Sequence, residues 1–402
     1  MSVERVVVVG GGIIGCSIAW RLAQRGVSVV LVEKDQPVSK ATWAAAGMLH
    51  PLIDTDNPAL HKLARASIEL FPAFVDELRN ITGIDAQLRL SGKLDVAFNA
   101  DEFNKLRARY AGVQGGGITE LDRDGARELE PALASDFHGA FLVNGDASVD
   151  NRKLGTAVEG AAHASGVQFR IGSAARKVVS TSSKFQHVEL QDGTRLQADA
   201  VVIAAGAWSS ELIGLPVKIP VLPVRGQMLA LEPEAALLQR MVVTLDCYIV
   251  PRSGRRLLVG ATIERVGFDT RTTDAGINGL WRAAERVVPD IRDANMVETW
   301  AGLRPGTPDD LPILGTDPHI NGVYYATGHF RNGILLAPIT AQAMSDLIVT
   351  DKSTHDLSSF TIGRFQVDVT DPHCDLCGSP MREFHCRIIC PVCGYQRDCS
   401  DP

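Results

Sequence analysis

The stretch "RVVVVGGGIIGCSIAWRLAQRGVSVVLVEK" (residues 5–34) decides the fold. Its residues 6–9 form a continuous apolar run, which predicts a β-strand buried on both faces. Gly10, Gly12 and Gly15 follow with the spacing G-x-G-x-x-G and lead into a helical pattern. In such a turn the first glycine makes the tight bend, the second lets the backbone approach a pyrophosphate, and the third lets the helix pack on the strand. The pattern favours a dinucleotide-binding βαβ unit over glycines used only for packing.

A second strand is predicted at 27–33, and it ends in Glu33. A carboxylate at this position would accept hydrogen bonds from both ribose hydroxyls of an adenosine dinucleotide, and it would disfavour a 2′-phosphate. The predicted ligand is therefore FAD or NAD.

Three later segments discriminate between these two ligands. In "KATWAAAGMLHP" (40–51) the small side chains leave room for a flat ring, and "ADAVVIAAGAWSS" (198–210) is an apolar strand that ends in small residues. In "GVYYATGHFRNGILLAPITAQAMSDLIV" (322–349) we expect a strand, a glycine turn, and a helix that starts at Asn332–Gly333. A helix start directs free N–H groups toward negative charge, which suits the edge of a reduced flavin.

Composition limits the alternatives. The chain has 402 residues, of which 45% are hydrophobic and 22% charged, so it is long enough for two or three packed units. Its formal net charge is −7 without a basic run, which argues against nucleic acid as a main partner. No apolar stretch reaches the ~20 residues that a membrane helix needs. Since glycines interrupt the apolar N-terminus before any cleavage pattern, we expect no signal peptide and a cytoplasmic protein.

Six of the eight cysteines lie after residue 373, which indicates a local metal site rather than a disulfide framework. Cys374-x-x-Cys377 and Cys390-x-x-Cys393 are two knuckles whose four thiolates suit a closed, structural, tetrahedral Zn²⁺ site. The segment resembles a zinc ribbon, and a unit this short needs a metal to fold. An iron site and a tail with reactive thiols stay open as alternatives. Further candidate ligands are Cys386, Cys399, His373 and His385.

Several motifs together carry a resemblance to a known family. They are V-x-G-G-G-I-I-G, the glutamate that ends the second strand, AAAGML, "SVDNRKL" (148–154), AAGAWS, "PVRGQML" (223–229), "AGLRPGTPDDLPILG" (301–315) and "ATGHFRNGILLAP" (326–338). Over about residues 3–350 the chain resembles the D-amino acid oxidase family of FAD-dependent oxidoreductases, and within it the glycine oxidases of thiamine biosynthesis.

The resemblance implies an α/β plus α+β fold, in which a Rossmann-like FAD-binding domain is paired with a sheet-rich substrate domain. We expect residues 1–365 to form the oxidoreductase and 366–402 the zinc-ribbon-like tail. The expected FAD-binding segments are about 1–85, 145–215 and 300–350, and the expected substrate domain is about 86–144 and 216–299. Strand-like runs at 87–98 and 217–262 and an amphipathic helical pattern at 61–80 agree with this division.

The reaction implied is oxidation of glycine or another small amino acid, such as sarcosine or a D-amino acid. A hydride passes from Cα to flavin N5, the imine hydrolyses, and O2 is reduced to hydrogen peroxide. Three other functions stay open: a D-amino acid dehydrogenase that uses a quinone or protein acceptor, a cyanide-forming glycine dehydrogenase with partner subunits, and a flavin-binding scaffold directed by the tail. A protein partner for the zinc tail and a homo-oligomer are also left open.

Arg304 stands among Ala, Gly, Leu and Pro, so a permanent charge there must find an anion. Its planar guanidinium could grip the substrate carboxylate with two hydrogen bonds. The alternative is an ion pair with Asp309 or Asp310 of the same loop. The resemblance adds Tyr248 as a second carboxylate ligand and Arg331 as a residue at the mouth of the site, so that all three are the expected catalytic and substrate-binding residues. Tyr248 could instead be a core aromatic residue and Arg331 a surface residue.

The resemblance also implies noncovalent FAD contacts from the first glycine turn, the loop after the second strand, and the turn before the last helix. The residues expected are Gly10, Gly12, Ile13, Ile14, Gly15, Glu33, Lys34, Ala41, Thr42, Ala46, Gly47, Met48, Val178, His329, Phe330, Arg331, Asn332, Gly333, Ile334 and Leu335. Two positions depart from glycine oxidases, since Asp246 replaces a frequent histidine and Ile263 a frequent methionine. These departures leave the preferred substrate open. His50 is interpreted as a plain loop histidine, with a position near the flavin as the alternative.

Overall fold

The computed structural model describes residues 3–51, 57–112, 117–365, 374, 376–377, 379, 381–384 and 387–398. Its first sheet has six strands in the order β18-β19-β12-β1-β2-β8. The strands are β1 (Arg5–Val9), β2 (Ser28–Glu33), β8 (Gln168–Ile171), β12 (Ala200–Ile203), β18 (Ile313–Thr316) and β19 (Val323–Thr327). All neighbours pair in parallel except β18, which is antiparallel to β19. The predicted strand, glycine turn, helix and second strand are confirmed.

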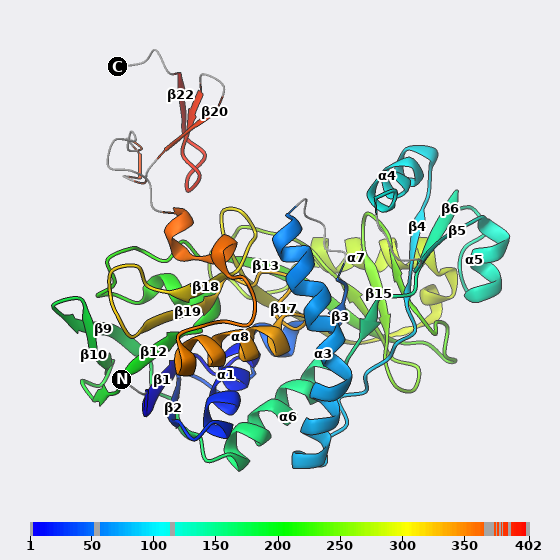
Figure 1. The fold of residues 1–402 in the computed structure, drawn as a ribbon. Helices are drawn as coiled ribbons and strands as arrows, with labels where there is room; N and C mark the ends of the chain where they lie inside the picture. The colour runs from blue at the N-terminus through cyan, green and yellow to red at the C-terminus, as the bar shows by residue number, and fades with distance from the viewer. Residues whose placement is uncertain are drawn as a thin grey trace.

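This sheet is buried on both faces, as the apolar runs predict. Val6 and Val8 of β1 pack into a helix-covered core, whereas Val7 and Val9 pack into a separate core on the opposite face. The helical layer contains α1 (Ile13–Gln24), α3 (Pro58–Thr82), α6 (Asn151–Ala164) and α8 (Ala337–Thr350), which gather on one side in Figure 1. A three-stranded antiparallel sheet of β9 (Ala175–Thr181), β10 (Lys184–Leu190) and β11 (Arg195–Gln197) covers the other face.

The second large sheet has eight strands in the order β17-β13-β16-β15-β14-β4-β6-β5. They are β4 (Lys93–Ala97), β5 (Ile118–Leu121), β6 (Gly139–Val143), β13 (Leu222–Glu232), β14 (Met241–Val243), β15 (Tyr248–Pro251), β16 (Leu257–Gly260) and β17 (Asn295–Gly306). In Figure 1 the strands β1, β2 and β12 lie on one side of the long helix α3, and β4, β5 and β6 lie on the other.

The eight-stranded sheet also has two distinct faces. Leu229 and Leu231 of β13 pack under α7 (Asp274–Val287), whereas Met228 and Ala230 face the other way, toward a cluster that includes Trp300. The second face is the one that borders the cavity described below. β17 runs across residue 300 within this sheet, so the predicted boundary at that residue falls inside a strand. The division into domains stays a prediction.

The remaining elements are short or peripheral. They are α2 (Ala41–Ala44), β3 (Met48–Leu49), α4 (Ala100–Tyr110), α5 (Arg123–Leu129), β7 (Ala147–Ser148), the 3-10 helices at Gly206–Glu211, Pro289–Asp293, Ser358–Phe360 and Ile362–Phe365, and the C-terminal strands β20 (Arg382–Phe384), β21 (Arg387–Ile389) and β22 (Gln396–Asp398). The last three pair into a small antiparallel sheet. Among the helices of the described residues, none has the length and apolarity to cross a membrane.

Candidate functional site

A cavity of about 370 Å³ lies where the carboxyl ends of the six-stranded sheet meet one face of the eight-stranded sheet. Its wall is built from the turn after β1, the loop 41–50, the strands β13, β15 and β17, and the turn 326–335. A second hollow, bordered by Glu33, Lys34 and Trp208, shares Gly12, Ala41 and Thr42 with the first. Together the two hollows provide a long path beside the end of β1, which is where open α/β sheets bind ligands.

The glycine turn brings the backbone close to this path. Gly10 has φ of 109°, and a Cβ there would lie 2.3 Å from the carbonyl oxygen of Ala204. A Cβ on Gly15 would lie 1.9 Å from the carbonyl oxygen of Gly10. Any larger residue at position 15 would therefore prevent the close approach of α1 to β1. Glu33 ends β2 with its carboxylate fixed, because Oε2 accepts from the Gly11 N–H at 2.7 Å. This turn therefore has the close approach that a dinucleotide phosphate requires.

The wall from Ala44 to Gly47 is held from behind by side chains of three other elements. Asn151 of α6 donates to the carbonyls of Thr42 and Trp43 at 2.9 and 3.0 Å. Trp300 Nε1 donates to the Ala44 carbonyl at 3.0 Å, and Arg252 donates to the Ala46 carbonyl at 2.6 Å. Because the carbonyls point toward these donors, the loop presents small side chains to the cavity.

Arg152 reinforces the same wall through its charge and its planar shape. Its Cζ lies 3.7 Å from the ring centroid of Trp43 and 5.0 Å from that of Trp300. Its guanidinium is ion-paired with Glu298 at 2.8 Å, and Glu298 also pairs with Arg256. Cation–π contacts and a two-pronged ion pair together fix the loop from the side opposite to the cavity.

The turn before α8 forms the opposite wall. α8 begins at Ala337, so the predicted helix start at Asn332–Gly333 is wrong by about one turn. The Leu336 N–H nevertheless donates to the Asn332 carbonyl at 2.8 Å, which gives this segment a helical turn of its own. His329 is 2% exposed and contacts Thr340 Oγ1 at 3.2 Å, and burial lowers the pKa of its imidazole to about 3. The ring is therefore neutral.

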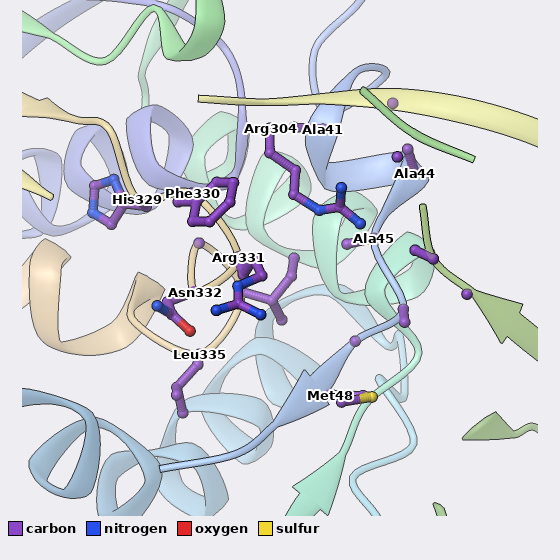
Figure 2. A pocket seen from close by; sticks show the side chains of 18 of the residues that line it. Ala41, Ala44, Ala45, Met48, Arg304, His329, Phe330, Arg331, Asn332 and Leu335 are labelled. Carbon is purple, nitrogen blue, oxygen red and sulfur yellow. The ribbon is translucent and has the colours of Figure 1, made fainter. Parts of the chain in front are cut away.

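Arg304 extends from β17 into the cavity, where Figure 2 shows it reaching toward the space between the two walls. A Cβ on Gly226 of β13 would lie only 2.2 Å from its Nη1, so the guanidinium lies directly over that glycine. Nη1 donates to the Thr262 carbonyl at 3.0 Å. Asp309 is instead ion-paired with Arg364 at 2.8 Å, and no ion pair joins Arg304 to an acid in the described part of the chain.

Tyr248 lies beside Arg304 at the start of β15. Its ring fills the space over Gly260, where a Cβ would come within 2.6 Å of the hydroxyl, and its Oη lies 3.7 Å from Met228 Sδ. Burial raises the pKa of its phenol, and the guanidinium groups of Arg304 and Arg331 oppose this shift. The hydroxyl therefore stays protonated at neutral pH and can donate a hydrogen bond.

Comparison with known proteins now decides the family. The family described as "FAD dependent oxidoreductase" (DAO) matches residues 5–347. The chain belongs to this family of FAD-dependent oxidoreductases. It is 39% identical over 368 residues to a glycine oxidase of Geobacillus kaustophilus, a match that covers 89% of this chain and 96% of that protein. The crystal structure of glycine oxidase from that organism superimposes with a TM-score of 0.86 at 37% identity and covers 91% of this chain and all of the other.

A bifunctional protein ThiO/ThiG of Trichormus variabilis is 37% identical over 366 residues. The match covers 90% of this chain but 55% of that protein, so the chain spans about half the length of its bifunctional relative.

The residues predicted to contact FAD fit such a cofactor in this FAD-dependent oxidoreductase. The first cavity is lined by Gly12, Ile13, Ile14, Ala41, Thr42, Ala46, Gly47, Met48 and all of 328–335, and the second by Gly10, Gly12, Glu33 and Lys34. The fit rests on the glycines that open the turn and on the small-residue wall. Gly15 and Val178 line neither hollow, and Val178 is 1% exposed within β9. The individual contacts remain predictions.

The structure also locates the residues that were expected around the mouth. Arg331 is exposed at the cavity wall, with Cζ 5.4 Å from the centroid of its neighbour Phe330. Asp246 and Ile263, the two departures from glycine oxidases, both line the cavity. His50, interpreted as a plain loop histidine, also lines it, together with Lys93.

Sequence reasoning missed several residues of the site. Arg152, Arg252 and Trp300 act from behind the small-residue wall, and Met228 lies beside Tyr248. Arg152 lies in the motif "SVDNRKL" and Met228 in "PVRGQML". The two motifs therefore identified the right segments, but they did not predict the roles of these side chains.

The C-terminal cysteines come together as the two knuckles predict. The Sγ atoms of Cys374, Cys377, Cys390 and Cys393 all lie within 4.8 Å of one another. Cys374 and Cys393 are 3.4 Å apart, as are Cys377 and Cys390. Four thiolates at about 2.3 Å from one ion would be roughly 3.8 Å apart, so this set can hold a metal. The other candidates, His373, His385, Cys386 and Cys399, lie outside the described residues.

Proposed function

We propose that this protein oxidises glycine or a similarly small amino acid at Cα and releases an imine. The observation that carries the proposal is the Arg304 guanidinium, which lies over Gly226 and beside Tyr248 in the cavity that FAD would share. A fixed guanidinium suits a carboxylate, because its fork can donate two parallel hydrogen bonds. The named glycine oxidases among the relatives support the same substrate class.

The protein's own groups would mainly bind and orient the substrate. Arg304 holds the carboxylate, the protonated hydroxyl of Tyr248 donates to it, and Arg331 closes the mouth side. FAD, when bound against the two walls, supplies the two-electron acceptor. The small side chains of Ala44 to Gly47 let a flat ring lie close to the substrate, and a fixed orientation can lower the barrier by several kcal/mol, about 7–11 at most.

We propose O2 as the electron acceptor and hydrogen peroxide as a product. The alternative is a D-amino acid dehydrogenase that passes electrons to a quinone or to a protein. Solved structures with this fold include both an oxidase and a dehydrogenase by name. The structure called iminodiacetate oxidase is 26% identical to this chain, with a TM-score of 0.81. An L-proline dehydrogenase at 22% identity shares the fold alone.

One experiment tests substrate and acceptor together. Glycine, sarcosine, proline and a set of D-amino acids are mixed without oxygen with the purified yellow protein, and flavin bleaching is followed. Oxygen is then admitted and peroxide is measured. Bleaching by glycine or sarcosine with stoichiometric peroxide supports the proposal. Bleaching without peroxide favours the dehydrogenase, and no bleaching by any amino acid contradicts both.

We further propose that the product serves the thiazole branch of thiamine synthesis, because relatives include bifunctional ThiO/ThiG proteins. A strain that lacks its own glycine oxidase and depends on thiamine should grow when this gene is supplied. A catalytically competent protein that fails to restore growth would exclude this role while leaving the chemistry intact.

For the tail we propose one structural Zn²⁺ held by Cys374, Cys377, Cys390 and Cys393. An all-cysteine set leaves no open position for catalysis, so the ion would stabilise the fold of the tail. A docking role toward another protein is consistent with such a unit. Metal analysis of the purified chain should give one zinc per chain, and iron in its place would indicate a rubredoxin-like site.

A further inference from the structure

The segment that connects β16 to α7 holds the backbone group to which Arg304 is hydrogen-bonded. It comprises residues 261–273 and is here called the connecting segment. The carbonyl of Thr262 in this segment accepts from Arg304 Nη1 at 3.0 Å. A carbonyl is a neutral acceptor, so it holds the guanidinium without cancelling the charge that would attract a substrate carboxylate.

Strand β13 lies between Arg304 and the connecting segment. On one side β13 pairs with β17, where Val224 is opposite Arg304. On its other side β13 pairs with β16 and then, through a single bridge, with Glu264 of the connecting segment. The side chain of Arg304 must therefore cross β13 to meet Thr262. It can cross because Gly226 has no side chain, and a Cβ there would lie 2.4 Å from Arg304 Cζ.

Two buried side chains of β13 hold the connecting segment from the other face of the sheet. Successive side chains of a strand alternate between its faces, so Arg225 and Gln227 point away from the cavity that Gly226 borders. They are 5% and 0% exposed. Arg225 Nε donates to the Glu264 carboxylate, and Gln227 Nε2 donates to the same carboxylate at 2.9 Å. Glu264 therefore ties the connecting segment to both side chains.

Further hydrogen bonds extend this attachment to both sides of Glu264. Arg225 and Glu264 exchange two backbone hydrogen bonds, at 2.8 and 2.9 Å. The Gln227 N–H donates to Thr262 Oγ1 at 2.9 Å, and Gln227 Oε1 accepts from the Thr273 N–H at 2.7 Å. Because Thr262 is only two residues from Glu264, the position of its carbonyl depends on these contacts.

We propose that Glu264 is a positioning residue for Arg304. This inference rests on the proposed function. Held by Arg225 and Gln227, Glu264 fixes the Thr262 carbonyl, and that carbonyl fixes the orientation of the guanidinium. Two parallel hydrogen bonds to a carboxylate require such a defined orientation. Glu264 itself does not line the cavity, so it acts on the substrate only through Arg304.

The test compares the holoenzymes of wild type, Glu264→Ala and Glu264→Gln. Acetate is the probe of the carboxylate grip, and flavin absorbance follows its binding. Residues of one hydrogen-bond network are commonly coupled by factors of about 2–150, so Glu264→Ala should raise the acetate dissociation constant and KM about tenfold. Glu264→Gln keeps one acceptor oxygen and should lose less. Arg225 keeps Asp269 at 3.3 Å, so both variants should fold and bind flavin.

A structural role would have a different signature. It would lower the yield of yellow protein, while KM and the acetate affinity of the folded fraction would stay at the wild-type values. Glu234→Ala, the same change at an exposed glutamate after β13, is the matched control and should resemble wild type in all three measurements.

A second background shows whether Glu264 acts through the guanidinium. Arg304→Lys lacks the planar fork, so adding Glu264→Ala to it should raise the acetate dissociation constant by less than about threefold. Wild-type acetate affinity and KM in Glu264→Ala, or an equal loss in both backgrounds, would overturn the inference alone. Failure of every amino acid to bleach the wild-type flavin would overturn the proposed function, and the acetate titration would still decide whether Glu264 positions Arg304.

Discussion

The catalytic body and the C-terminal tail reach a folded state by different means. In the body, the central strands bury apolar side chains on both faces, and Val6, Val7 and Val8 are all fully inaccessible. In the tail, the buried cluster consists of Cys374, Met381 and Cys390, so two of its three members are metal-ligand candidates. A long chain can offset the conformational entropy lost on folding by burying apolar side chains. A short chain needs a cross-link or a bound ion in addition. The body should therefore fold without its tail's metal, and the tail should not.

Removal of the metal should have the largest effect and should affect the tail alone. Cys390→Ala should abolish zinc binding, because structural zinc in small units contributes about 10–16 kcal/mol to their folding. Metal analysis should fall from one zinc to none, and limited proteolysis should cut the tail while the flavin absorbance persists. Cys16→Ala, a change at a buried cysteine of α1, is the matched control and should keep its zinc. Loss of flavin from Cys390→Ala would contradict the separation of the two regions.

Removal of the Arg304 fork should affect the body alone. Two charge-assisted hydrogen bonds contribute about 1.5–3 kcal/mol each, so Arg304→Ala should lower kcat/KM by about 10²–10⁴-fold. Arg304→Lys keeps the charge but loses the planar fork, and it should recover only part of this loss. Steady-state kinetics measure both, with zinc content as the control that should stay unchanged. Wild-type kcat/KM in Arg304→Ala would refute the assignment.

Acid should destabilise the body through His329. Its pKa is about 3 in the folded state and near 6.5 when unfolded, so the unfolded chain binds more protons between these values. Above about pH 6.5 the imidazole is neutral in both the folded and the unfolded state, so its burial does not lower the free energy of unfolding. Below that pH the free energy of unfolding should fall by up to about 1.4 kcal/mol per pH unit.

Urea titrations followed by tryptophan fluorescence can measure this slope in the body, since all five tryptophans precede residue 301. His329→Gln does not titrate, and its slope between pH 6 and pH 4 should be smaller. An unchanged slope would show that other groups govern the acid sensitivity.

The smallest expected effect concerns the support behind the small-residue wall. Arg152→Ala removes the cation–π contacts to Trp43 and the ion pair with Glu298, so FAD should bind about tenfold more weakly, or by about 1.4 kcal/mol. Fluorescence titration of the apoprotein with FAD gives the affinity. Lys153→Ala, at the exposed neighbour, should bind FAD like wild type. Equal affinities for the two variants would mean that the wall is stable without Arg152.

The sequence pattern was sufficient to predict structure wherever the residues involved lie in one continuous segment. The strand, glycine turn and helix at residues 5–24 follow from apolar periodicity and from the steric needs of Gly10 and Gly15. The cysteine knuckles follow from spacing alone, since a tight turn brings each pair together. The apolar spacing at 61–80 predicted a helix, and the structure has α3 at Pro58–Thr82. The start of α8 was misplaced because a separate helical turn precedes Ala337.

Residues that meet from distant segments escaped prediction. His50 and Asp146 are 96 positions apart, and they meet because β3 pairs with β7. Lys93 joins them because the preceding Gly92 N–H donates to the Asp146 carbonyl. By itself the sequence determined the dinucleotide turn, the cluster of cysteines and the presence of an arginine that needs an anion. Only the tertiary structure decided that Asp309 pairs with Arg364, that Arg304 enters the cavity over Gly226, and that His50 and Lys93 line the same cavity. The reason is that periodicity and spacing describe neighbours along the chain, whereas partners of buried charges are set by strand pairing across it.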